Sequence, residues 1–378
     1  MDLSFDEEQR ILRDSFRDFL QKEVTMDCVR EMWEDEKGYS PEIWKKMGKL
    51  GWMGLRIPEE YEGNGLNFLD LAILFEEMGR VALPGPFLST ALATELIIDA
   101  GSSKQKETYL PKIARGEITA TLAISEPNPR YDASGIHLSA TADQDAFLLK
   151  GTKLFVLDGH TADLMIVAAR TKKGRKLEKG VTLFLVEKGT PGVSKQLLKS
   201  MDGGRKQCEV DFEDVRIPAD QVLGPVDGGW PALQRVLNKG AVAVSMEMVG
   251  GGQKVLELTV DYAKKRVQFD QPIGSFQAIK HKCAQIMQEV EGAKSIAYYA
   301  AWAMDQGGKE ADIAASVAKT FCSDMYRKAT AESLQIYGAL AFTWEQDIHI
   351  FLKRAKMNEF IFGDPTFHRE QLAKMLGY

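Results

Sequence analysis

The sequence predicts a mainly helical protein with a β domain in its middle, and three observations carry this prediction. The first third of the 378-residue chain contains one amphipathic helical pattern after another, separated by short loops. From about residue 120 the pattern changes to short β-rich runs separated by turn residues. From Trp230 onward, long amphipathic patterns return with few helix breakers. We therefore expect three domains: residues 1–119, 120–229 and 230–378.

Capping signals define the expected helices of the N-terminal part. Ser4 and Glu7 have the spacing of a capping box at the start of the first helix. Ser40 is expected to cap a helix that begins at Pro41 and stops at Gly51. Two further helices are predicted for residues 68–81 and 102–116.

The middle part is typical of an antiparallel sheet or a small barrel. Its β-rich runs, among them "TATLAIS", "AFLLKGTKLFVLDG" and "VTLFLVEK", are short and are separated by turns. Pro218 and "LGPVDGGW" end this part of the chain. The last part is expected to form a bundle of about four long helices.

Composition and charge exclude several classes of protein. The net charge of −6 argues against a nucleic-acid-binding protein, which needs a basic face. The four cysteines share no CxxC spacing, so neither a metal site nor a disulfide framework is expected. No apolar run approaches the roughly 18 residues of a membrane span. The start "MDLSFDEEQR" has no leader pattern, so we expect a cytoplasmic protein.

One stretch near the C-terminus, "NEFIFGDPTFHREQ", places Gly363, Asp364 and Pro365 between two helical patterns. Gly, Asp and Pro together break a helix, and Asp364 is well placed to cap the helix that restarts at Thr366. The local pattern therefore favours a turn residue. A working acid is the alternative, and the rest of the chain has to decide between the two.

Several longer motifs occur in an order that one known family shares. "LAISEP" at residues 122–127 opens the β region, and "RVQFDQPIGSFQAIKH" at residues 266–281 follows the first helix of the last part. "LQIYGALAF" at residues 334–342 precedes the last helices. Together with "AGSSKQKETYLPKIARGE", these motifs resemble the acyl-CoA dehydrogenase family over essentially the whole chain. The resemblance implies that family's fold: an N-terminal helical domain, a middle β-sandwich or barrel and a C-terminal four-helix bundle.

The resemblance also implies that the chain binds FAD, with part of the binding surface supplied by a neighbouring subunit. The positions that match the flavin-ring contacts lie on two expected strands: Leu122, Ile124, Ser125, Phe155 and Leu157. The positions that match the grip on the dinucleotide across the interface are Arg266, Phe269 and Gln277, and those at the adenosine end are Gln335 and Gly338. An Arg at such a position can form a charge-assisted bond with the pyrophosphate.

These positions also have ordinary structural interpretations. A single Arg on a surface helix is usually a solvated charge, but the joint spacing around Arg266 favours the cofactor role. Phe155 and Leu157 alternate as core residues of a strand do. Both interpretations fit the two strand residues, because a flavin ring needs an apolar wall.

The chain departs from the family at the expected substrate loop. The family has a glycine-rich loop against the thioester arm, whereas the corresponding residues here are Asn128, Pro129, Arg130 and Tyr131. These bulky residues predict either that the family's usual contacts with the CoA arm are missing or that the entrance is reshaped. Leu157 also stands where the family often has a Thr that bonds the flavin. The expected substrate contacts are Thr90, Tyr131, Asn238, Gly240 and Ala241, although helix packing explains Thr90 equally well.

The largest departure concerns the proton acceptor. Acyl-CoA dehydrogenation needs a carboxylate to take the α-proton while the β-hydrogen leaves as hydride to the flavin. In most of the family this carboxylate is a Glu at the position of Gly363, and in a second subset it is a Glu at the position of Gly240. Gly363 keeps its backbone N–H, which in the family helps to bind the thioester carbonyl in an oxyanion hole.

Two carboxylates remain as replacements. Asp364 is the neighbour of the usual base, and Glu247 lies two turns after Gly240 on the same expected helix face. A helix cap is the structural alternative for Asp364. A buried, hydrogen-bonded carboxylate is the alternative for Glu247, in the apolar stretch "SMEMVGGG".

Three functions fit these features. The first is an FAD-dependent acyl-CoA dehydrogenase with a relocated base, which acts on a cyclic, branched or steroid-type acyl group and passes electrons to electron-transfer flavoprotein. The second is a non-catalytic subunit that completes a partner's flavin site in a hetero-oligomer. The third is another flavin chemistry on the same fold, such as acyl-CoA reduction or monooxygenation. A homotetramer and a heterotetramer are both compatible with the sequence.

Overall fold

The computed structural model describes residues 5–128, 130–174 and 176–378, which form two compact units. Unit 1 consists of Met1–Glu31, Phe68–Leu83 and Asn238–Tyr378. Unit 2 consists of Met32–Asn67 and Pro84–Leu237. The helices expected for the N-terminal part are thus divided between the units, whereas the whole β region belongs to unit 2.

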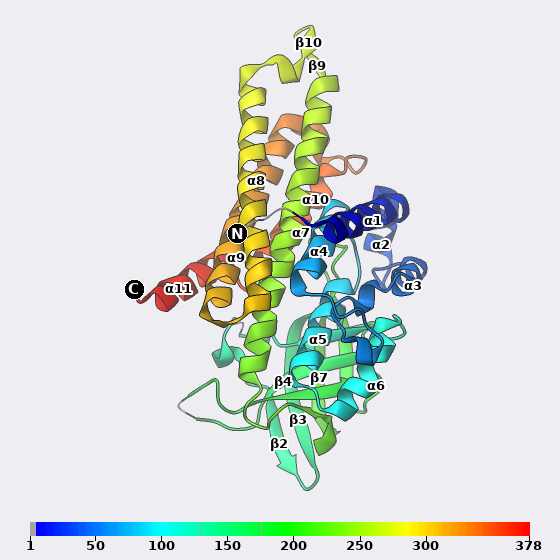
Figure 1. Ribbon diagram of the computed structural model, residues 1–378, viewed down its shortest axis with the longest axis vertical. Helices are drawn as coiled ribbons and strands as arrows, with labels where there is room; N and C mark the ends of the chain where they lie inside the picture. The colour runs from blue at the N-terminus through cyan, green and yellow to red at the C-terminus, as the bar shows by residue number, and fades with distance from the viewer. Residues whose placement is uncertain (1–4, 129, 175) are drawn as a thin grey trace. The chain divides into compact units, whose positions relative to one another are not determined.

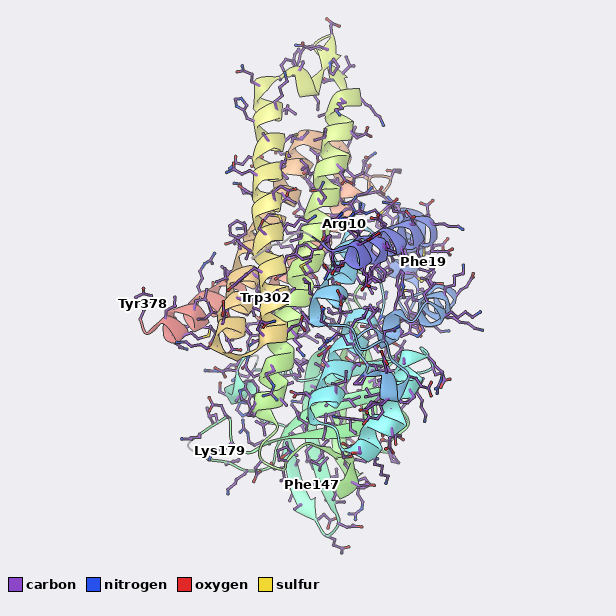
Figure 2. The ribbon with its side chains drawn as sticks, in the orientation of Figure 1. Arg10, Phe19, Phe147, Lys179, Trp302 and Tyr378 are labelled. Carbon is purple, nitrogen blue, oxygen red and sulfur yellow. The ribbon has the colours of Figure 1, made fainter. Side chains whose placement is uncertain are left out.

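Unit 1 is built around long helices (Figure 1). It contains α1 (Glu7–Glu23), α4 (Phe68–Arg80), α8 (Gln277–Gln306), α9 (Gly308–Tyr337), α10 (Ile348–Phe360), α11 (Pro365–Leu376), most of α7 (Trp230–Lys265) and part of α2 (Met26–Glu34). α9 packs against α8, α10 and α11, while α4 packs against α1 and α8. Trp302, which Figure 2 labels, lies on α8.

The last part of the chain is helical, as predicted, and its helices differ in length. Three helices, α7, α8 and α9, have 36, 30 and 30 residues, whereas α10 and α11 have only 13 and 12. The chain breaks where glycines adopt positive φ, at Gly338 (66°) and Gly363 (102°). These breaks divide the last part of the chain into short helices.

Two glycines allow α7 to pass very close to α4. A Cβ added at Gly250 would lie 1.8 Å from the Glu76 carbonyl oxygen, and one added at Gly79 would lie 2.1 Å from the Glu247 carbonyl oxygen. Only residues without a Cβ permit this approach. The backbone of α7 around Glu247 is therefore fixed against α4.

The capping signals were predictive where the structure describes them. Ser40 Oγ accepts the Ile43 N–H at 3.3 Å, at the start of α3 (Pro41–Lys49), as expected. Ser4 lies outside the described residues. The cap observed on α1 is Asp6, whose carboxylate accepts the Gln9 N–H at 2.8 Å.

Unit 2 combines helices with the sheet. Its α-helices are α3, α5 (Phe87–Ala100) and α6 (Ser103–Ala114). Short 3-10 helices occur in both units: η1 (Trp52–Gly54), η2 (Glu59–Tyr61), η3 (Ala133–Gly135), η4 (Ala219–Gln221), η5 (Ile273–Ser275) and η6 (Gly338–Phe342). The strands of unit 2 are β1 (Ala120–Ala123), β2 (Ser139–Asp143), β3 (Ala146–Leu157), β4 (Leu164–Arg170), β5 (Val181–Glu187), β6 (Val193–Leu198), β7 (Gln207–Pro218) and β8 (Val222–Leu223).

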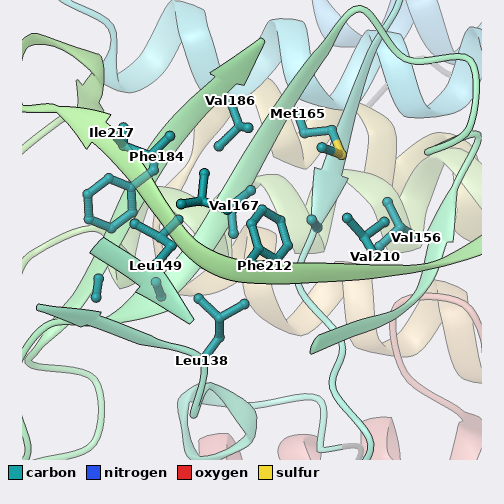
Figure 3. Packing of buried hydrophobic residues seen from close by; sticks show 14 of the residues in the cluster. Leu138, Leu149, Val156, Met165, Val167, Phe184, Val186, Val210, Phe212 and Ile217 are labelled. Atoms are coloured by element: carbon teal, nitrogen blue, oxygen red, sulfur yellow. The ribbon is translucent and has the colours of Figure 1, made fainter. Parts of the chain in front are cut away.

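The sheet is mostly antiparallel, as predicted, but β4 pairs in parallel with β1 and, at Ser139 and Arg170, also with β2. Its order is β6-β7-β3-β2-β4-β5-β8, and β1 pairs with β4 in parallel, with Leu122 opposite Ile166. A parallel pair cannot be joined by a tight hairpin, so the local turn signals did not reveal it. Alternating residues of these strands pack into one apolar core around Leu149, Phe184 and Phe212 (Figure 3).

Candidate functional site

The usual base position, Gly363, is closed to any side chain. Gly363 has a φ of 102° and Phe362 before it has a φ of 59°, so the turn between α10 and α11 uses backbone conformations that favour glycine. A Cβ at Gly363 would lie 2.6 Å from Phe367 Cδ1 and 2.7 Å from His368 Nε2. A glutamate at this position therefore does not fit the observed turn.

Two buried side chains hold this turn. His368 Nε2 lies 2.9 Å from the Phe362 carbonyl oxygen, and Lys319 Nζ donates to the Gly363 carbonyl oxygen at 2.7 Å. Lys319 also donates to the Glu359 carbonyl at 2.9 Å. Burial lowers the pKa of Lys319 to about 7 and, with the Lys319 charge as a second cause, lowers the pKa of His368 to about 4. The sequence reasoning missed both residues.

Asp364 caps α11, as the local sequence pattern favours. Its Oδ1 accepts the Phe367 N–H at 2.7 Å, and Pro365 occupies the first helical position. The Gly363 N–H has no hydrogen-bond acceptor among the described residues, although Gly363 is buried. The turn therefore presents one free backbone donor beside a capping carboxylate.

Glu247 is a buried carboxylate on α7 that is tied to the end of α10. Its side chain belongs to a residue with 5% exposure, and its Oε2 accepts a bond of 3.2 Å from Asn358 Nδ2. Asn358 is fully buried, and its Oδ1 has no partner within the part of the chain that the structure describes. Since Asn358 stands five residues before Gly363, unit 1 connects Glu247 to the helix end that leads into the turn.

The five expected flavin-ring positions come together in unit 2, at the ends of β1 and β3. The Ser125 carbonyl accepts the Leu154 N–H at 2.9 Å, and Thr121 Oγ1 donates to the Leu157 carbonyl at 2.6 Å. Because these two bonds join the end of β1 to the end of β3, Leu122, Ile124 and Ser125 lie beside Phe155 and Leu157.

Phe155 has the features of a ligand-contacting residue rather than a core residue. It is 50% exposed, has a φ of 56° and lies in a β-bulge between Lys153 and Val156 of β3. A bulge re-aims a side chain, and a half-exposed aromatic ring on a sheet offers an apolar wall. Leu157, by contrast, is buried, with 9% exposure. The wall thus fits the isoalloxazine ring that the resemblance implies.

A buried ion pair holds the loop that follows β1. Lys153, which is fully buried, donates to the Ile124 carbonyl at 2.9 Å and to Glu126 Oε1 at 2.7 Å. Glu126 also accepts the N–H groups of His137 and Leu138, which ties the end of β1 to the start of β2. Pro129 lies outside the described residues. Sequence reasoning missed this pair, although the signal was present as a charge in the otherwise apolar run "KLFVL".

The expected dinucleotide contacts are exposed at the far end of α7 and α8 in unit 1 (Figure 1). Arg266 precedes the hairpin formed by β9 (Val267–Gln268) and β10 (Gln271–Pro272), Phe269 is 87% exposed at its tip, and Gln277 begins α8. Within the described residues, the Arg266 guanidinium makes no hydrogen bond or ion pair. An exposed guanidinium with no protein partner among the described residues suits an anionic cofactor.

The end of α9 lies against the same part of α7. Tyr262 and Tyr337 stack with ring centroids 4.0 Å apart, and Tyr262 Oη donates to the Tyr337 carbonyl at 3.3 Å. Gln335 and Gly338 flank Tyr337 and are exposed. The expected adenosine-end contacts therefore stand on the element that packs beside the helix leading to Arg266.

The expected substrate positions are only partly available to a ligand. Thr90 is buried, and its hydroxyl accepts the Ala120 N–H at 3.2 Å, which supports the packing interpretation. Asn238 donates to Asp312 at 2.7 Å. Gly240 and Ala241 are buried on α7, and Tyr131 is partly exposed in its loop. Their roles toward a substrate stay predictions.

No group of three or more His, Cys, Asp or Glu side chains in the described ranges could hold a metal ion. Among the same residues, no helix is long and apolar enough to cross a membrane.

Comparison with known proteins identifies the family. The chain matches the models of the acyl-CoA dehydrogenase N-terminal domain at residues 6–117, the middle domain at residues 121–215 and the C-terminal domain at residues 227–377. It is 33% identical to an acyl-CoA dehydrogenase of Bacillus subtilis over 98% of each chain. It is 31% identical to the cyclohex-1-ene-1-carbonyl-CoA dehydrogenase of Geobacter metallireducens over 94% of each.

Two further matches bear on the cofactor and on redox partners. The CarC subunit of the caffeyl-CoA reductase-Etf complex of Acetobacterium woodii is 31% identical over 91% of each chain. A structure described as an FAD complex of PigA superimposes with a TM-score of 0.92 and 25% identity, over 100% of this chain and 99% of that one. The three family models and these relatives show that the chain belongs to the acyl-CoA dehydrogenase family of FAD-dependent oxidoreductases.

Proposed function

We propose that this chain catalyses the FAD-dependent α,β-dehydrogenation of an acyl-CoA thioester, with Glu247 as the proton acceptor and the Gly363 N–H as a donor to the thioester carbonyl. The observation that carries this proposal is the bond between Glu247 and Asn358. It links the buried carboxylate of α7 to the last turn of α10, next to the turn that contains Gly363.

Of the two candidate bases, Glu247 has the better support. Asp364 Oδ1 already accepts a helix N–H as a cap, and a cap is a sufficient reason for an Asp at that position. Glu247 caps no helix end: it lies buried in the middle of α7, in an apolar stretch, and accepts a bond from Asn358. Burying a carboxylate costs free energy, and a role as proton acceptor in the reaction would account for a carboxylate at this position. Asp364 remains the second candidate.

The proposed chemistry divides the work between the chain and its cofactor. When bound, FAD accepts the β-hydrogen with its electron pair as hydride. The Gly363 N–H binds the thioester carbonyl and stabilises the negative charge that develops on its oxygen. Glu247 takes the α-proton, and the electrons of that C–H bond form the new double bond. In unit 2, Phe155, Leu122 and Leu157 would offer an apolar wall to the flavin ring.

The substrate is proposed to be a cyclic, branched or steroid-type acyl-CoA. The bulky residues 128–131 replace a glycine-rich loop, so the entrance is shaped differently from that of a straight-chain enzyme. The name of the 31% identical Geobacter relative specifies a ring substrate. The proposed electron acceptor is electron-transfer flavoprotein, in keeping with the Etf complex named for the Acetobacterium relative.

Two substitutions test the base. Glu247→Gln and Asp364→Asn both keep the shape of the side chain and remove the proton acceptor, while Asn still caps a helix. Anaerobic stopped-flow measurement with a saturating thioester substrate should show flavin reduction slowed about 100-fold or more in Glu247→Gln. Asp364→Asn should stay near the wild-type rate. Slow reduction in Asp364→Asn alone would transfer the role to Asp364, and wild-type rates in both variants would refute the assignment.

A non-catalytic subunit is the second candidate function, and two observations favour it. The usual base position is closed by Phe367 and His368, and Arg266 is exposed on a hairpin where it could serve a partner's cofactor. The visible spectrum of the protein purified alone separates the two functions. Stoichiometric FAD that bleaches with a CoA thioester supports the complete enzyme, whereas a colourless protein supports the partner role. Loss of flavin in Arg266→Ala would show that this hairpin binds the cofactor.

A further inference from the structure

The turn at Gly363 contains two consecutive peptide groups, and each is held by a different buried side chain. The Phe362 carbonyl is bonded by His368, and the Gly363 carbonyl is bonded by Lys319. The first of these peptide groups is the one that carries the Gly363 N–H. Because a trans peptide is planar and its C=O and N–H point in opposite directions, a bond to the Phe362 oxygen also sets the direction of the Gly363 N–H.

The hydrogen bonds of His368 define its tautomer. A carbonyl oxygen can only accept, so Nε2 carries the proton in the 2.9 Å bond to Phe362. Nδ1 is then an acceptor, and it lies 3.1 Å from Ser316 Oγ of α9, whose hydroxyl donates to it. Burial and the neighbouring Lys319 lower the pKa of His368, which keeps the ring neutral. The imidazole is thus locked between a hydroxyl donor and a carbonyl acceptor.

We propose that His368 is a positioning residue for the dehydrogenation: through the Phe362 carbonyl it aims and polarises the Gly363 N–H that binds the thioester oxygen, and Ser316 fixes the tautomer that allows this. A chain of hydrogen bonds strengthens its terminal donor, because each bond polarises the next group. The chain Ser316–His368–Phe362–Gly363 ends at the donor that has no acceptor among the described residues. This inference rests on the proposed function.

The effect can be measured on a bound thioester without turnover. Acetoacetyl-CoA has an acidic α-carbon, and its enolate absorbs in the near ultraviolet, so the pH at which half of the bound ligand is enolate reports how well the site stabilises the enolate oxygen. With the flavin-loaded wild-type protein, this midpoint should lie below that of the free ligand. In His368→Phe it should rise by about one pH unit, a tenfold change in acidity.

Three variants complete the test. His368→Gln retains an N–H donor and should recover most of the wild-type midpoint. Ser316→Ala removes the hydroxyl that donates to His368 Nδ1, so the tautomer is no longer fixed. This variant should raise the midpoint by less than His368→Phe does. Arg369→Ala, on the same helix as His368, removes an exposed ion pair with Asp324 of α9 and should match the wild type.

The outcomes separate this inference from the proposed function. A wild-type protein that neither binds acetoacetyl-CoA nor shifts its midpoint would refute thioester binding itself. Normal binding with equal midpoints in wild type, His368→Phe and Ser316→Ala would overturn the role of His368 alone. Should His368→Phe fail to fold, Ser316→Ala and His368→Gln decide the matter, and a wild-type midpoint in Ser316→Ala would contradict the proposal.

Discussion

Two fully buried lysines, one in each unit, bond backbone carbonyls of a loop in different surroundings. Lys153 in unit 2 bonds the Ile124 carbonyl and also forms an ion pair of 2.7 Å with Glu126. Lys319 in unit 1 bonds the carbonyls of Glu359 and Gly363 at 2.9 and 2.7 Å and the Ser323 hydroxyl at 3.3 Å. Its donors thus meet neutral oxygens.

The two lysines also differ in the pKa of their side chains. Burial lowers the pKa of Lys153 to about 8, although the Glu126 carboxylate opposes the change, and burial lowers the pKa of Lys319 to about 7. A lysine that meets a carboxylate at hydrogen-bond distance stays charged over a wider pH range than one that meets carbonyls. Removing Lys153 would leave a buried carboxylate without its cation, whereas removing Lys319 would leave carbonyl oxygens without a donor.

The largest effect is expected for Lys153→Met, because it leaves the Glu126 carboxylate buried without its cation. The free energy of unfolding, measured by urea titration, should fall by about 3–5 kcal/mol. The double variant Lys153→Met/Glu126→Gln removes the stranded charge and should recover part of that loss. Equal stability of the single and double variants would show that the ion pair is not what holds the loop after β1.

Lys319→Met should cost less, about 1–3 kcal/mol, because it leaves neutral carbonyls without a donor rather than a stranded charge. Its effect should also depend on pH. The unfolded chain keeps a lysine proton up to about pH 10.4, whereas folded Lys319 loses it near pH 7. The unfolded state therefore binds more protons between these values, and wild-type stability rises with pH across that window.

Urea titrations at pH 7, 8.5 and 10 check this dependence, with pH-matched Lys319→Met as the reference. The advantage of the wild type should grow with pH, and the part of the rise that begins near pH 7 should be missing from the variant. An advantage that is constant or shrinks with pH would contradict the assignment of the low pKa to Lys319.

The smallest effect is expected for Asp364→Ala, which removes one cap from α11. Loss of the bond to the Phe367 N–H should lower the free energy of unfolding by about 1 kcal/mol. Asp364→Asn should remain close to the wild type, since Asn caps equally well. Comparable losses in both variants would mean that the negative charge, and with it the attraction to buried Lys319, matters more than the cap.

Short-range signals in the sequence determined a large part of this protein. The helix caps at Ser40 and Asp364, the start of α4 at Phe68 and the change from helical to β patterning near residue 120 were all predictable. These features depend on residues within about one helical turn or one strand of each other, so local periodicity and capping chemistry describe them. The spaced motifs around Arg266 also pointed to the family.

Only the tertiary structure determined which side chains bond to the turn at Gly363 and to the helix before it. Lys319 lies 44 residues before Gly363, and Asn358 lies 111 residues after Glu247, yet both pairs are bonded. The parallel pairing of β1 with β4, for example Leu122 opposite Ile166, belongs to the same class of contacts. No local pattern specifies such contacts, because they form only when separate helices and strands pack, and each depends on a side chain whose partner is chosen by that packing.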